Sequence, residues 1–202
     1  MGKLYQQVGR YLHGTFDDII VELGSDRWEG STAYFADLAN THNTRLITVD
    51  LDPEAYHRVT KTVNKDYLNR VDFVCADASL WCKSFDLLSL RIKVLYLDNF
   101  DWDWEPDRST NEIRKQQDWY RTKGLEMTNL NCQINHQSQM MYLLPCMASK
   151  SIVCIDDTYE YKGVYIGKGG SVVPYLMANG YQLLKSGDYG VILGRGTRNN
   201  IV

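Results

Sequence analysis

Short apolar runs alternate with amphipathic stretches along most of this chain. Five runs of five to seven residues are rich in Val, Ile and Leu, which is typical of strands buried on both faces of a parallel sheet. The predicted strands are residues 18–23, 45–51, 71–75, 92–97 and 151–155. Between them, residues 31–41 place apolar side chains largely on one helical face, and Pro53 suits the first turn of a helix that runs to about Asn64. The alternation predicts an α/β fold with helices on both faces of the sheet.

The last third of the chain predicts two further helices and a closing hairpin. The helices are expected at 134–147 and 167–179, and Gly180 is a suitable stop for the second one. Two short apolar runs, 181–184 and 190–193, flank a Ser-Gly-Asp turn and predict an antiparallel hairpin. We therefore predict that all 202 residues form one domain on a mostly parallel, seven-stranded sheet of Rossmann-like type.

One segment interrupts this regular pattern. Phe100–Asn131 is polar, charged and rich in Trp, and it is too long for a plain connection, so it is predicted to be an insertion with its own helix. Trp102 and Trp104 either wall a binding pocket or pack the insertion against the core or a partner subunit. The rest of the segment could form either a lid over the site or a contact in a homo-oligomer, and the sequence does not choose between the two.

Composition and charge narrow the class of protein. The formal net charge is −3, which gives no support for a nucleic-acid partner. The five cysteines include no CxxC pair, so we do not expect a zinc site. We expect free, buried thiols instead. The first 14 residues are polar, and no apolar run approaches the roughly 20 residues that cross a bilayer. We expect a cytoplasmic protein without a membrane partner.

Acidic residues follow every strand of the predicted parallel set. In open sheets of this kind, ligands bind beyond the carboxyl ends of the strands. These acids are Glu22, Asp50, Asp77, Asp98 and the pair Asp156-Asp157. Asp50 stands where such folds place an acid that accepts hydrogen bonds from ribose hydroxyls. The alternative is a solvated loop acid.

The turn after the first strand is a candidate cofactor loop. Gly24 permits a tight turn and a close approach to the backbone, and Ser25 follows it. Gly30 and Ser31 open a helix whose free N–H groups suit a carboxylate or phosphate. The G-x-G-x-x-G fingerprint is missing, so hydride chemistry with NAD is weakly supported. The alternative is a plain turn in which Ser31 caps the helix.

These segments together carry a family resemblance. The runs VELGSDRWEGST, ITVDLDP, VCADA, VLYLDN and IVCIDDT resemble the successive motifs of class I S-adenosylmethionine (SAM)-dependent methyltransferases. They are most similar to the small-molecule O-methyltransferase branch that includes the cephalosporin hydroxylase-type proteins. The resemblance covers roughly residues 15 to 195 except the insertion. It implies methyl transfer from SAM to a hydroxyl, less readily an amine, of a small-molecule acceptor.

The resemblance also implies roles for individual residues. Glu22 and Gly24 would lie near the methionine part of SAM, and Asp50 would bind its ribose. Asp77 and Ala78 would lie beside the adenine.

Metal-dependent members of the same family hold Mg²⁺ with acids after the fourth and fifth strands. Asp98, Asp156 and Asp157 match those positions. Carboxylate oxygens suit this hard cation, which would activate the acceptor hydroxyl. The alternative is that the acids cap loops or bind substrate without a metal.

The catalytic base is less clearly marked than the cofactor site. Asp98 and His136 are the candidate catalytic residues, and His136 could deprotonate a hydroxyl if it faces the site. A lone helical histidine is more commonly a surface or capping residue. Lys168 either meets an acidic substrate or points to solvent.

Three other functions stay open at this point. The chain could bind SAM without transferring a methyl group, it could be a nucleotide-binding oxidoreductase, or it could be a structural protein that kept a degenerate fold. Methyl transfer from labelled SAM, and the relative binding of NAD and S-adenosylhomocysteine (SAH), distinguish them.

Overall fold

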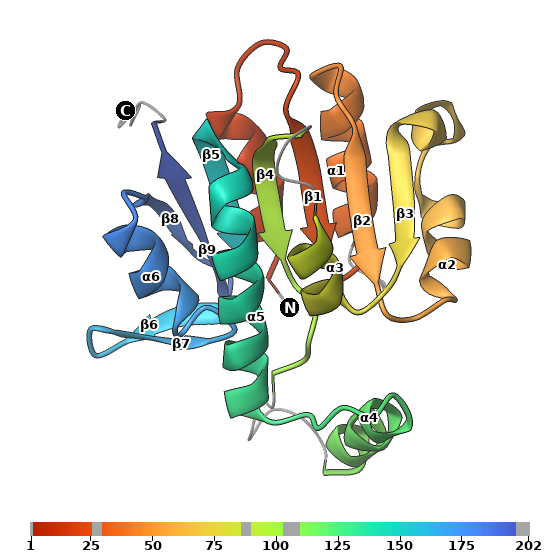
Figure 1. The fold of residues 1–202 in the computed structure, drawn as a ribbon, viewed down its shortest axis with the longest axis vertical. Coiled ribbons are helices and arrows are strands. Elements are labelled where there is room, and N and C mark those ends of the chain that lie inside the picture. The colour runs from red at the N-terminus through yellow and green to blue at the C-terminus, as the bar shows by residue number, and fades with distance from the viewer. Residues whose placement is uncertain (1, 26–29, 86–89, 103–109, 197–202) are drawn as a thin grey trace.

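The computed structural model describes residues 2–25, 30–85, 90–102 and 110–196, and it contains a seven-stranded sheet in the order β3-β2-β1-β4-β5-β9-β8 (Figure 1). The strands of this sheet are β1 Ile19–Leu23, β2 Leu46–Asp50, β3 Val71–Cys75, β4 Ile92–Leu97, β5 Met147–Ile155, β8 Gln182–Gly187 and β9 Gly190–Arg195. Strands β1 to β5 pair in parallel, whereas β9 runs antiparallel to both β5 and β8. The predicted fold class and closing hairpin are therefore confirmed.

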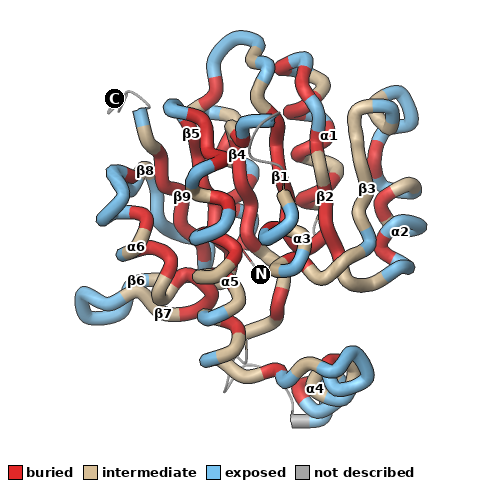
Figure 2. Tube along the Cα trace, in the orientation of Figure 1, coloured by how far each residue is buried: buried red, intermediate tan, exposed pale blue. Residues whose placement is uncertain are grey.

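Helices cover both faces of the sheet. The α-helices are α1 Ser31–Thr41, α2 Ala55–Thr62, α3 Ala78–Ser84, α4 Thr110–Thr122, α5 Asn129–Leu143 and α6 Val172–Ala178, and the 3-10 helices are Leu4–Tyr11, Lys65–Arg70 and Leu144–Cys146. One hydrophobic cluster packs α3, α5 and α6 against the sheet, and the other packs the N-terminal 3-10 helix, α1 and α2 against the opposite face. Strand β1 is buried throughout and β4 and β5 are buried over most of their length, as expected for parallel strands covered on both sides (Figure 2).

The insertion contains a helix of its own, as predicted. Helix α4 lies beyond the carboxyl ends of the parallel strands, apart from the helices that cover the sheet (Figure 1). Helix α5 begins at Asn129, earlier than the predicted 134, because the Thr128 side chain caps it by accepting the Asn131 N–H at 3.0 Å. Residues 103–109, which include Trp104, lie outside the described part of the chain.

A small second hairpin was not predicted. Strands β6 Thr158–Tyr161 and β7 Val164–Gly167 pair antiparallel around the two-residue turn Lys162-Gly163. Both turn residues have positive φ, 51° and 82°, which is the geometry that joins two strands tightly. Because Gly167 belongs to β7, helix α6 starts at Val172 and not at 167 as predicted.

The N-terminal segment is more buried than its polar composition indicated. Leu4, Tyr5 and Val8 are at most 2% exposed and belong to the cluster that packs against the sheet. Their spacing places them on one side of the 3-10 helix, and the polar residues Lys3, Gln6 and Arg10 around them are exposed. No helix in the described residues is long and apolar enough to span a membrane.

We expect the N-terminal helix to contribute to the stability of the whole domain. Leu4→Ala should lower the free energy of unfolding by about 2–5 kcal/mol, because it leaves a cavity in a closely packed core. Urea denaturation measures this change. The matched control is Arg10→Ala on the exposed side of the same helix, which should change stability by less than about 0.5 kcal/mol. Equal effects of the two substitutions would contradict the packing described here.

Candidate functional site

A cavity of about 440 Å³ lies at the carboxyl ends of the parallel strands. Its size falls within the range of small-molecule sites. The sequence-predicted residues that line it are Gly24, Ser25, Asp50, Asp77, Ala78, Asp98, Asp156 and Asp157. The other predicted site residues, Glu22, Gly30, Ser31 and His136, are not part of the described lining.

Gly24 is required by the protein's own backbone. Its φ is +94°, and a Cβ atom there would lie 2.6 Å from both the Asn99 nitrogen and the Asp98 carbonyl carbon. The turn after β1 thus packs directly against the end of β4. We expected Gly24 to allow a ligand close to the main chain, whereas the described contact is with Asp98 and Asn99.

Glu22 is fully buried beneath this turn. Its carboxylate accepts hydrogen bonds from the hydroxyls of Ser31, Thr32 and Thr48, each at 2.7 Å. These contacts join β1, β2 and the start of α1. Ser31 is therefore neither a cavity residue nor the helix cap that we considered, because its hydroxyl is turned inward to Glu22. Gly30, with φ +88°, occupies the cap position.

Asp50 connects the first two turns. One carboxylate oxygen accepts the Ser25 N–H at 2.9 Å, and the other accepts the Asp52 N–H at 2.7 Å. Both turns are thereby fixed around a side chain that is 7% exposed and lines the cavity. A carboxylate oxygen can accept more than one hydrogen bond, so these two backbone contacts do not by themselves prevent Asp50 from accepting ligand hydroxyls.

Asp77 has a structural role as well as a position on the cavity. Its Oδ1 accepts the Leu80 N–H at 2.9 Å and caps α3. Ala78 begins the helix at the cavity wall. The two residues predicted to lie beside adenine therefore share one end of the cavity.

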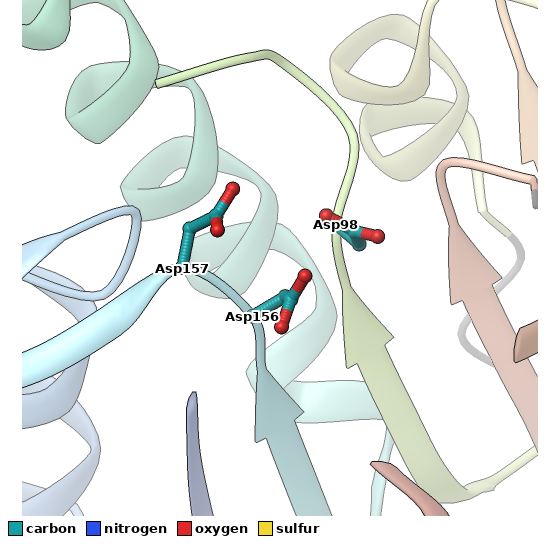
Figure 3. A group of neighbouring side chains, drawn as sticks. All are labelled: Asp98, Asp156 and Asp157. Carbon is teal, nitrogen blue, oxygen red and sulfur yellow. The ribbon is translucent and has the colours of Figure 1, made fainter. Parts of the chain in front are cut away.

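The three predicted metal ligands come together, as Figure 3 shows. Asp98 follows β4 and Asp156-Asp157 follow β5, and their ligand oxygens lie within 4.8 Å of one another. A lysine lies among them. The Lys168 ammonium forms an ion pair with Asp98 and lies 3.1 Å from Asp157 Oδ2. The three carboxylates are thus close enough to bind a hard cation, but Asp98 and Asp157 already contact the Lys168 ammonium.

The charges of this group are strongly coupled. Burial alone would lower the pKa of Lys168, but the carboxylates of Asp157, Asp98 and Asp156 outweigh it and hold that pKa well above its usual value. Burial raises the pKa of Asp98, the Lys168 ammonium opposes that shift, and Asp157 adds to it, so the net direction is upward. Lys168 is consequently a cation at neutral pH. Its side chain is only 3% exposed, so the solvent-facing alternative considered from the sequence is wrong.

His136 is close to this group but does not face the cavity. It is fully buried on α5, and its Nδ1 donates to the Cys132 carbonyl at 2.8 Å, while Nε2 has no hydrogen-bond partner among the described residues. Burial, together with the nearby Lys168, lowers the pKa of His136 to about 3. The imidazole is therefore neutral, and it is not part of the described cavity lining, where a substrate hydroxyl would have to lie to be deprotonated.

Aromatic residues of the insertion close the other side of the cavity. Trp119 and Tyr120 of α4 line it, and the Tyr120 ring packs on Phe100 with centroids 4.8 Å apart. The Tyr120 hydroxyl accepts the Asp101 N–H at 2.8 Å. Trp102 packs against the same cluster, so it serves the packing of the insertion that we considered as one alternative.

A group of amide side chains was not found from the sequence. Asn135 Oδ1 accepts from Asn99 Nδ2 at 3.1 Å and also from Gln139 Nε2, which reaches Ser79 Oγ at 3.3 Å. The group joins the end of β4 to α5 and α3 along the cavity wall. The i, i+4 spacing of Asn135 and Gln139 on a helix was the available signal.

Comparisons with known proteins identify the fold. No protein-family model and no curated protein matches the sequence. A putative rRNA methylase from Clostridium thermocellum matches with a TM-score of 0.59 and 12% identity over 96% of both chains. A putative methyltransferase from Streptococcus mutans in complex with SAH matches with a TM-score of 0.53 and 11% identity over 96% of this chain and 98% of that one.

A third similar structure is CalS11, a TDP-rhamnose 3'-O-methyltransferase of calicheamicin biosynthesis. Its TM-score is 0.52 at 13% identity, over 96% of this chain and 75% of that one. At identities this low, the likeness establishes the fold alone. The chain has the Rossmann-like fold of class I SAM-dependent methyltransferases, while the O-methyltransferase branch stays a prediction.

The buried His136 should make stability depend on pH. Because its folded pKa of about 3 lies below the usual unfolded value near 6.5, the unfolded chain binds a proton that the native protein does not. This contribution to stability is therefore fully present above about pH 6.5 and is lost as the pH falls toward 3, by about 1.4 kcal/mol per pH unit.

Denaturation of wild type and His136→Gln between pH 7 and 4 measures this effect. In the variant, the free energy of unfolding should fall less steeply with decreasing pH, by the equivalent of about one bound proton. The control His13→Gln changes an exposed histidine and should keep the wild-type slope. A wild-type slope in His136→Gln would mean that the imidazole is not held neutral.

Proposed function

We propose that this protein transfers a methyl group from SAM to a hydroxyl, less readily an amine, of a small molecule. The observation that carries the proposal is a cavity at the carboxyl ends of a methyltransferase-type sheet, lined by the acids that follow four of its strands. Ligands of open parallel sheets bind at this edge. The fold does not by itself dictate the chemistry, so the residues of the cavity must support it.

One side of the cavity suits the cofactor. Ser25 and Asp50 border it near β1 and β2, and Asp77 and Ala78 border it at the start of α3. Asp50 offers carboxylate oxygens to hydroxyl groups, and Asp77 offers its remaining lone pairs to an amino group. SAM, when bound, supplies an electrophilic methyl group on a positively charged sulfur, and the acidic lining favours such a cation.

The other side suits a small acceptor that is not a polyanion. Asp101, Glu112 and Trp119 line this part, and Lys168 is the one basic side chain in the described lining. Phosphate groups would be repelled by this charge balance. Similar structures include rRNA methylases, so RNA is the alternative acceptor that experiments must test.

Asp98 is the residue best placed to accept a proton. It lines the cavity, and the upward shift of its pKa makes it a stronger base than an exposed aspartate. Its carboxylate is held by Lys168 on one oxygen and by the Tyr96 hydroxyl at 3.2 Å on the other. The aromatic side chains of α4 exclude water from the acceptor side, and orientation then contributes most of the catalysis.

Magnesium was a further expectation for the acids after β4 and β5. Three carboxylates in one place have the right donor type for it. The Lys168 ammonium already neutralises part of this group, so the proposed reaction uses no metal.

Binding of SAH tests the cofactor assignment. At a concentration of one hundred times its Kd, SAH should stabilise the protein by about 2.7 kcal/mol, seen as a rise in melting temperature. Asp50→Ala should abolish the rise, because it removes the carboxylate at the end of β2. Asp72→Ala, which removes a surface partner of Arg45, is the control and should keep it. A stronger response to NAD than to SAH would overturn the assignment.

Transfer of label from methyl-labelled SAM tests the reaction itself. Label should enter small hydroxyl compounds in preference to amines, and it should not enter RNA. Asp98→Asn should lower kcat by about 10²–10⁴-fold, because the proton acceptor is lost. The variant also loses the ion pair with Lys168, so SAH binding and melting temperature are measured with it and should show that the fold and the cofactor side are intact. The control Asp37→Asn alters an exposed acid of α1 and should leave kcat unchanged.

Two results would contradict this proposal. Label in RNA would show that the acceptor is a nucleic acid. SAH binding without transfer to any compound of a broad panel would favour a binding protein.

A further inference from the structure

Three carboxylates crowd the edge of the sheet beyond β4 and β5 (Figure 3). Their positions follow from the parallel pairing of Leu97 with Ile155, which places Asp98 next to Asp156 and Asp157. Asp156 is 4% exposed, so water screens these charges poorly. Like charges this close disfavour one another's ionised form, and a positive charge among them relieves that repulsion.

Lys168 supplies this charge from within the fold. Its side chain is 3% exposed, and its Nζ forms an ion pair with Asp98, lies 3.1 Å from Asp157 Oδ2 and lies 3.4 Å from the Asp98 carbonyl oxygen. An ammonium has three N–H donors, and these three contacts use them. The Lys168 ammonium therefore makes its contacts with Asp98 and Asp157 and does not extend toward solvent.

The backbone around Lys168 is built for this position. The β6–β7 hairpin pairs Thr158 with Gly167, and the next N–H, that of Lys168, donates to the Asp157 carbonyl at 3.0 Å. The Gly169 N–H then donates to Thr158 Oγ1 at 2.8 Å. Gly167 has φ +84°, and a Cβ atom there would overlap the Asp157 carbonyl oxygen. The chain on both sides of the lysine is thus fastened to the segment that carries two of the acids.

A divalent metal would compete for the same oxygens. Mg²⁺ demands about six oxygen ligands at 2.0–2.1 Å around one centre, which requires carboxylates that are free to turn toward it. Asp98 and Asp157 are both held by Lys168. The buried ammonium would also repel a second cation, because water and salt screen the repulsion between two positive charges only weakly there. The acids therefore have the oxygen donors of a metal site, but the Lys168 ammonium already supplies the positive charge that stabilises them.

We propose that Lys168 is the permanent cation of this carboxylate cluster and takes the place that a divalent metal would hold. The ammonium is part of the chain, so chelators cannot remove it. It acts as a positioning residue that orients Asp98 at the cavity. This assignment concerns which ion the acids hold and is independent of the reaction. Its catalytic consequence, a reaction that needs no added metal, rests on the proposed function.

Mn²⁺ binding, followed by electron paramagnetic resonance and by melting temperature, tests the assignment without SAM or acceptor. Lys168→Met removes the charge and keeps a side chain of similar length, so it should bind Mn²⁺ at least about tenfold more tightly than wild type. Lys168→Met/Asp156→Asn should lose the gain, because one carboxylate ligand is missing. The matched control Lys162→Met changes an exposed lysine in the turn of the same hairpin and should behave as wild type.

Two results would overturn the assignment. The first is a folded Lys168→Met variant that gains no Mn²⁺ affinity. The second is a saturable Mn²⁺ site in the wild-type protein that Asp156→Asn removes, and this measurement decides the matter even if Lys168→Met does not fold. A Lys168→Met variant that folds only with Mg²⁺ or Mn²⁺ would support the assignment. Because none of these readouts involves methyl transfer, failure of the proposed function would leave them unchanged.

Discussion

The parallel register of β1, β4 and β5 is the constraint on which the rest of the structure depends. Leu23 pairs with Leu97, and Leu97 pairs with Ile155, so all three strands end at one level. The ladder continues for one residue beyond the strands, since Asp98 N–H donates to the Leu23 carbonyl at 2.8 Å. Gly24 makes this approach possible because it has no Cβ atom to strike the end of β4. The row of strand ends then becomes the floor of the cavity.

Charge at this row has to be balanced within the fold. Glu22 is buried, and its carboxylate oxygens accept hydrogen bonds from three hydroxyls. Beyond β4 and β5, the Lys168 ammonium lies against Asp98 and Asp157 and offsets part of the negative charge of the acids there. The net charge of that cluster stays negative, which favours a cationic ligand such as a sulfonium and disfavours phosphate. The same electrostatics thus bear on stability, on metal preference and on the choice of acceptor.

Much of the architecture was predictable from local patterns. The bounds of β3 and β4 and of α1 agree with the predicted residues, because strand and helix periodicity is a property of neighbouring side chains. The β6–β7 hairpin was missed although Lys162-Gly163 between alternating residues was a usable turn signal. The start of α5 was placed too late because its polar first turn carries no apolar periodicity, and only the Thr128 cap marks it.

The sequence by itself determined that acids follow each parallel strand and that the sheet edge is where they meet. That much needs only strand ends and the rule that parallel strands finish on one side. Tertiary structure alone decided which acids face the cavity, which are satisfied internally, and which share a cation. Lys168 and Asp98 are 70 positions apart, and only the fold brings their atoms together. Contacts of this kind depend on packing across the whole domain, which no local pattern records.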